Sequence, residues 1–181
     1  MDDSKIVNLF LKRDEEALKE AEKQYGKLCH YIANNILNSP LDAQECVNDT
    51  LLRAWNSIPP AKPKRLGAYL SKIARNLAID KYKAEKSQKR SKNKDALPLD
   101  ELEGCLSGTD SLIDEAILKD LINSFLRSLT KEKRIVFVQR YFYNASISEI
   151  AKSNDLTENN VKVMLLRLRN VFSEYIKKYG L

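Results

Sequence analysis

The stretch "SISEIAKSNDLTENNVKVMLLRLRN" at residues 146–170 has the pattern of two helices joined by a turn. Apolar residues give the first, short helix one apolar side. Asn154 and Asp155 supply turn residues that tolerate left-handed backbone geometry, and Thr157 stands where a helix N-cap is expected. The stretch therefore predicts a helix-turn-helix, a unit that proteins use to read DNA.

The second of these helices has two different sides. At about 100° per residue, six residues share one sector and are predicted to pack inward: Val161, Met164, Leu165, Leu168, Val171 and Phe172. Five residues lie opposite: Asn159, Lys162, Val163, Leu166 and Asn170. Amides, a cation and small apolar groups suit base edges and thymine methyls, so we predict that this side enters a major groove. The preceding basic segment brings three cations toward phosphates: Lys131, Lys133 and Arg134.

Charge alternates in blocks along the 181 residues. The net charge is −3 over residues 1–60, +10 over 61–94, −7 over 95–118 and +6 over 119–181. Basic blocks of this size favour a phosphate backbone, because each neutralised phosphate releases counterions. A solvated helix face is the alternative explanation for a charge run.

The segment 87–114 is predicted to be a flexible linker. It lacks sustained helical periodicity and collects Ser, Asn, Asp, Gly and Pro. It separates two predicted domains, residues 1–86 and 115–181, which both show the apolar periodicity of helices. The predicted fold class is therefore all-α, with two small helical domains joined by a linker.

Two helices are expected near the N-terminus, followed by a third with clear start signals. Apolar residues over 6–25 suit one helical face, and the pattern from Leu28 continues it as a second helix or an extension. Ser39 and Pro40 supply an N-cap and a first-turn proline for a helix that begins near Leu41.

Three carboxylates occupy one face of that third helix. Asp42, Glu45 and Asp49 stand at i, i+3 and i+7, so they share a side of the helix. Two explanations are open. They are either ordinary surface acids near a favourable helix N-terminus, or a docking stripe for a basic partner.

A basic loop and a long helix follow. The loop "SIPPAKPKR" at residues 57–65 has three prolines, so we expect an exposed and stiff excursion. The next helix carries a polar side that suits nucleic acid: Lys72, Arg75, Asn76, Asp80, Lys81 and Lys83. Tyr69 and Tyr82 are candidates either for stacking on unpaired bases or for core packing.

Several classes of protein are not supported by the sequence. The three cysteines are widely spaced, there is one His, and no dinucleotide, Walker or nucleophile-elbow motif occurs, so we predict no disulfide, metal site, cofactor or enzyme activity. The acidic N-terminus does not resemble a signal peptide, and no apolar run is long enough for a bilayer span. A cytoplasmic protein is expected.

Three segments, in this order, resemble one family: the bacterial RNA polymerase sigma factors of the extracytoplasmic-function (ECF) group. Residues 42–55, "DAQECVNDTLLRAW", are similar to the family's D-A-E-D-V-V-Q-E-T-F-L-R-A-W segment. Residues 70–82, "LSKIARNLAIDKY", are similar to its W-L-x-x-I-A-R-N-x-x-x-D-x-x-R segment. Residues 126–169 resemble the family's C-terminal domain with its L-P-x-x-x-R-x-V-F-x-L-R-Y pattern and helix-turn-helix.

The resemblance implies a promoter specificity factor that acts with core RNA polymerase. Contacts with the clamp helices of the largest subunit are implied for Asp42, Glu45, Asp49 and Arg53. Contacts with the −10 element, including a flipped base and the opened strand, are implied for Lys62, Lys64, Arg65, Arg75, Asn76, Asp80, Lys81 and Lys83. Contacts with the −35 element are implied for Lys131, Lys133, Arg134, Thr157, Glu158, Asn159, Asn160, Lys162, Leu166 and Arg167. The implied further partners are the flap of the second-largest subunit and an anti-sigma factor.

The sequence also departs from the family pattern. The family usually has a polar pair where Val163 and Met164 stand, so DNA shape and phosphate contacts are expected to carry more of the −35 recognition here. Tyr69 replaces a frequent Trp, and Thr130 a frequent Pro. Two other functions remain open from the residues alone: an autonomous helix-turn-helix regulator, and a helical adaptor whose basic blocks only balance surface charge.

Overall fold

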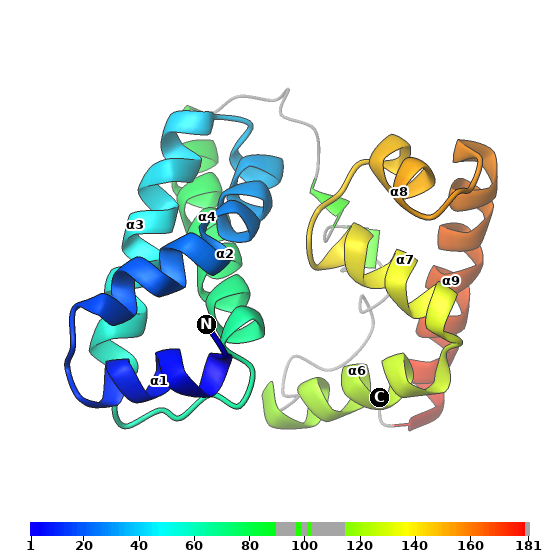
Figure 1. Cartoon of the computed structure of the whole chain (residues 1–181). Helices are drawn as coiled ribbons and strands as arrows, with labels where there is room; N and C mark the ends of the chain where they lie inside the picture. The colour runs from blue at the N-terminus through cyan, green and yellow to red at the C-terminus, as the bar shows by residue number, and fades with distance from the viewer. Residues whose placement is uncertain (90–96, 99–100, 103–114, 180–181) are drawn as a thin grey trace. The chain divides into compact units, whose positions relative to one another are not determined.

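A computed structural model describes residues 1–89, 97–98, 101–102 and 115–179, and every regular element in those residues is a helix (Figure 1). The chain divides into two compact units, Met1–Lys94 and Asp95–Leu181. The predicted all-α fold with two small helical domains is confirmed.

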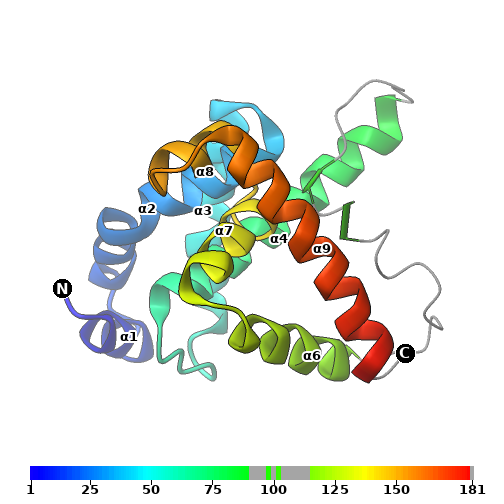
Figure 2. The same ribbon diagram turned by 90° about the vertical axis from the view of Figure 1, so that its right-hand side faces the viewer.

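The described residues of the N-terminal unit form four helices: α1 (Asp3–Leu11), α2 (Glu16–Leu37), α3 (Pro40–Ser57) and α4 (Leu66–Lys89). Helices α2, α3 and α4 pack against one another, and α1 contacts α2 and α4 (Figures 1 and 2). Alanines without any exposed surface line these helices: Ala17, Ala21, Ala33, Ala43, Ala54, Ala74 and Ala78. Such short side chains let the backbones of neighbouring helices approach closely.

The expectation of one helical face over residues 6–25 is wrong, because the chain turns between α1 and α2. Four consecutive charged residues, 12–15, leave no apolar position there, and Arg13 adopts a left-handed backbone with φ of 59°. The Asp14 carboxylate accepts a hydrogen bond from the Glu16 N–H at 3.0 Å, which satisfies a donor at the start of α2.

The predicted start of α3 is confirmed. Pro40 is its first residue, and the Ser39 hydroxyl accepts a hydrogen bond from the Asp42 N–H at 3.3 Å. The start of α4 is capped from far along the chain, because Asp3 Oδ2 accepts from the Leu66 N–H at 2.8 Å. These caps fix the residues at which α3 and α4 begin, and so the position of the polar side chains along each helix.

The helices with bounds in the described part of the C-terminal unit are α6 (Glu115–Ser128), α7 (Lys131–Tyr141), α8 (Ile147–Ser153) and α9 (Glu158–Tyr179). Its core is aromatic. The Phe125 ring lies 4.9 Å from the Phe172 ring and 5.5 Å from the rings of Phe137 and Tyr175, measured between centroids. This cluster joins α6, α7 and α9 through the large apolar area that aromatic side chains bury.

The helix-turn-helix forms as predicted from α8, a turn and α9. Ser146 and Glu149 form a capping box at the start of α8. Asp155 adopts the left-handed backbone expected of a turn residue, with φ of 55°, and the Thr157 hydroxyl accepts from the Asn160 N–H at 3.2 Å. Local side chains therefore set the starts of α8 and α9, and Asp155 provides the turn between them.

The structure differs from the predicted linker at its start and again in its middle. Helix α4 continues to Lys89, and Leu102 packs into the core of the C-terminal unit. Beside it, Glu101 Oε1 lies 3.0 Å from an Arg140 guanidinium nitrogen, and its Oε2 lies 2.5 Å from one of Arg169. Apolar burial and this ion-pair network therefore attach part of the segment to the C-terminal unit. Apart from residues 97–98, the remainder of the predicted linker lies outside the described residues.

Candidate functional site

The outer side of α3, here called the α3 face, combines acids with exposed leucines. Glu45 and Asp49 are exposed, Asp42 is half-buried, and Arg53 is exposed one turn beyond Asp49. Two leucines also lie in solvent: Leu41, 83% exposed, and Leu52, 57% exposed. The sequence analysis missed these leucines, although their spacing of eleven residues, about three helical turns, places them on one side of α3.

The predicted −10 residues are mostly accessible. Six are exposed on the loop and on α4: Lys62, Lys64, Arg65, Asn76, Asp80 and Lys83. Arg75 is half-buried, and burial lowers the pKa of its guanidinium.

The two tyrosines of α4 contribute to packing. Tyr82 is buried, and the hydroxyl of the partly buried Tyr69 donates to Ser57 Oγ at 2.7 Å. Both tyrosines thus serve packing in this structure.

Lys81 differs from the other predicted −10 residues, because carboxylates of α3 already hold it. Its ammonium nitrogen lies 2.7 Å from Asp42 Oδ1 and 2.5 Å from Glu45 Oε2. The hydrogen bonds that the ammonium donates to the carboxylates of Asp42, the larger cause, and of Glu45 raise the pKa of Lys81, so the ammonium stays charged. The structure thus joins one predicted DNA contact to two predicted docking residues.

The outer side of α9, here called the α9 face, is exposed as predicted: Asn159, Lys162, Val163, Leu166 and Asn170. Glu158, Asn160 and Arg167 are exposed beside it. One expectation fails, because Val171 was predicted to pack inward and is 48% exposed. Val171 lies at the edge of the apolar sector, where α9 borders a groove.

The basic start of α7 has two kinds of cation. Lys131 and Lys133 are exposed, which leaves them accessible to phosphates. Arg134 is also exposed, but its guanidinium donates to the Leu129 carbonyl oxygen at 3.0 Å. Since that carbonyl follows the last residue of α6, Arg134 holds the turn between α6 and α7 in this structure.

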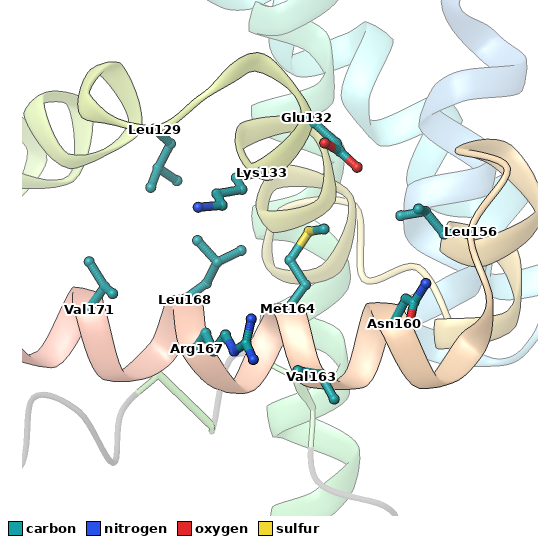
Figure 3. Close-up of a pocket in the computed structure, with 10 residues that line it drawn as sticks. All are labelled: Leu129, Glu132, Lys133, Leu156, Asn160, Val163, Met164, Arg167, Leu168 and Val171. Carbon is teal, nitrogen blue, oxygen red and sulfur yellow. The ribbon is translucent and has the colours of Figure 1, made fainter.

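A groove of about 510 Å³ lies between α9 and the segment that begins α7 (Figure 3). Leu168 and Met164 point into it from α9, and Leu129 and Lys133 face them from the other side (Figure 3). Three of the predicted −35 residues line it: Lys133, Asn160 and Arg167. An apolar side chain seated in this groove would therefore touch part of the predicted DNA surface.

Within the described residues there is no group of three His, Cys, Asp or Glu side chains arranged to hold a metal ion. Cys29 and Cys46 are buried free thiols, and burial raises the pKa of Cys29 to about 11. The helices found there include none that is long and apolar enough to cross a membrane.

Comparison with family models gives two matches that together include both candidate surfaces. Residues 23–88 match the model for Sigma-70 region 2, and residues 119–170 match the model for Sigma-70, region 4. The first match includes α3 and most of α4, and the second includes α7, α8 and the first half of α9. A search of curated proteins gives no match.

Proposed function

The chain belongs to the sigma-70 family of RNA polymerase sigma factors, and on that premise we propose which surface of it meets which partner. Region 2 and region 4 together in one chain are typical of the ECF group. The protein is an alternative sigma factor that binds core RNA polymerase and directs promoter recognition. Sigma factor families are not enzymes, so the nucleotide chemistry belongs to the polymerase.

The α3 face is proposed to dock on the clamp helices of the largest polymerase subunit. Glu45 and Asp49 offer exposed carboxylates to a basic partner, and Leu41 and Leu52 offer apolar area that water now covers. Charge would orient the encounter, and burial of the leucines would add affinity. This combination on one helix is the observation that carries the docking proposal.

The loop before α4 and the polar side of α4 are proposed to meet the −10 element. Exposed Lys62, Lys64 and Arg65 can neutralise phosphates, and Asn76 has the amide groups needed to hydrogen-bond a base edge. Capturing a flipped base costs a few kcal/mol, which several phosphate and base contacts can offset. Promoter opening therefore needs no catalytic residue in this chain.

The α9 face is proposed to read the −35 element. Its exposed Asn159 and Lys162 can bond base edges, and Val163 and Leu166 can contact thymine methyl groups. Because only one of these four side chains is charged, we expect DNA shape and phosphate contacts from Lys131 and Lys133 to carry much of the affinity.

Two further partners are proposed for the C-terminal unit: the flap of the second-largest polymerase subunit, and an anti-sigma factor. We place the anti-sigma contact at the groove beside α9, because Lys133, Asn160 and Arg167 line it. An apolar side chain bound there would cover part of the −35 surface and so exclude DNA. No observation in the described residues favours an autonomous regulator over a sigma factor.

Replacing Asp49 with Lys tests the docking proposal, because Asp49 is exposed and is not one of the carboxylates that hold Lys81. We expect affinity for core polymerase to fall by about tenfold or more, since an attraction becomes a repulsion. The matched control is Glu22→Lys, a charge reversal at an exposed position of α2. Equal binding of both variants and the wild type, in a titration of labelled protein with core enzyme, would refute the assignment of the α3 face.

A further inference from the structure

One cation lies between the two surfaces that the N-terminal unit is proposed to use. Lys81 projects from α4, and its ammonium contacts Asp42 and Glu45 of α3 at 2.7 and 2.5 Å. An ammonium group has three N–H donors, and each of these two carboxylates accepts one of them. In the free chain, the single charge of Lys81 therefore offsets part of the negative charge of two acids on the α3 face.

These ion pairs are accessible enough to be exchanged. The Lys81 side chain is 29% exposed and that of Glu45 is 64% exposed. Partly exposed pairs of this kind contribute little to stability, so a partner can replace them at small cost. The packing of α3 on α4 does not depend on them, because both helices bury apolar residues, among them Ala43 and Ala78.

The Lys81 ammonium limits what the two carboxylates can bind, and the carboxylates limit what Lys81 can bind. A phosphate that approaches Lys81 also meets the negative charges of Asp42 and Glu45, which repel it. A basic partner that approaches those carboxylates must compete with the Lys81 ammonium. Removing one interaction therefore strengthens the other.

We propose that Lys81 is an exchangeable counterion that couples polymerase docking to DNA binding: basic groups of core polymerase take over Asp42 and Glu45, and Lys81 is then released to bind phosphates of single-stranded promoter DNA. This inference rests on the proposed docking and −10 surfaces. By linkage, core polymerase raises the DNA affinity of this unit, and DNA raises its affinity for core polymerase by the same factor.

The first test measures the affinity of the free full-length protein for a fluorescent 20-nucleotide oligothymidylate. Fluorescence anisotropy gives this affinity at a series of salt concentrations. The double variant Asp42→Asn/Glu45→Gln keeps the side-chain shapes but releases Lys81. We expect it to bind the oligonucleotide about two- to fivefold more tightly. The slope of log affinity against log salt should steepen by about 0.7, the value for one more neutralised phosphate on a single strand.

Two matched triple variants separate exchange from a general change in charge. Adding Lys81→Gln to the double variant should abolish the gain, whereas adding Lys23→Gln should keep it, because Lys23 is exposed on α2 and belongs to neither proposed surface. Each triple variant is compared with the single Lys→Gln variant that it contains. If removal of the two carboxylates tightens oligonucleotide binding equally in both comparisons, the proposal is overturned, since loss of negative charge alone would then explain the tighter binding.

The second test measures the affinity of the single variants for core polymerase. Lys81→Gln removes a competitor of the polymerase and should bind core enzyme about two- to fivefold more tightly, whereas Lys23→Gln should bind like the wild type. If Asp49→Lys weakens core binding but Lys81→Gln does not strengthen it, the exchange is wrong and the docking surface stands. If Asp49→Lys has no effect, the docking surface itself is wrong.

Discussion

The two faces that carry the proposed function are attached to their units in different ways. On the α3 face, Asp42 and Glu45 hold Lys81 of α4, so polar groups join a docking surface to a DNA-binding helix. On α9, the residues opposite the exposed face pack on an aromatic core around Phe125. The difference implies that substitutions of Asp42 or Glu45 alter two binding events, whereas those on the α9 face alter one.

The largest expected effect concerns the aromatic core. Phe125 has no exposed surface, and replacing it with Ala should lower the unfolding free energy of the C-terminal unit by about 3–5 kcal/mol. Hydrogen exchange should then rise across α6 to α9 while the N-terminal unit keeps its protection and its affinity for core polymerase. Phe10→Ala, at a fully buried position of the other unit, should give the reverse pattern. If either variant lost protection in both units, the expectation that each substitution destabilises only its own unit would be contradicted.

A smaller and more selective effect is expected on the α9 face. Asn159→Ala and Lys162→Ala should each reduce discrimination at the −35 element by about 1–3 kcal/mol per lost base contact. Stability should change by less than about 0.5 kcal/mol, because both residues are exposed. The measurement is selection from a promoter library randomised at −35. The control is Lys177→Ala in the last turn of α9, and an unchanged preference in all three variants would show that this face reads no bases.

The smallest effect is expected where the segment before α6 meets the C-terminal unit. Glu101→Gln removes the charge that pairs with Arg140 and Arg169, and should lower the stability of this unit by about 1 kcal/mol. Amide exchange at residues 101–102 should rise. Glu174→Gln, at an exposed position of α9, is the matched control. Equal melting temperatures for the two variants would mean that this network contributes nothing to stability.

Features set by neighbouring residues could be predicted from the sequence. The starts of α3 and α9 follow from Ser39, Pro40 and Thr157, because caps act within one turn. The inward and outward sides of α9 follow from helical periodicity, apart from Val171 at the edge of the apolar sector.

Contacts between distant residues could not be predicted in this way. Lys81 follows Glu45 by 36 positions, and Arg169 follows Glu101 by 68, so no local pattern relates them. The break between α1 and α2 was missed because apolar spacing continues across it, although the charged run 12–15 was a visible signal. Arg134 was assigned to phosphates, while the Leu129 carbonyl oxygen that it contacts becomes apparent only in the folded turn.

The most direct test of the function is run-off transcription from fragmented genomic DNA with purified sigma-free core polymerase, with and without this protein, followed by sequencing of the RNA 5′ ends. A sigma factor should give discrete starts that require the protein and share upstream −10 and −35 elements. Parallel reactions with Asp49→Lys should lose these starts, and reactions with Glu22→Lys should keep them. The absence of new starts, with a core preparation that is active with another sigma factor, would contradict promoter recognition by this chain.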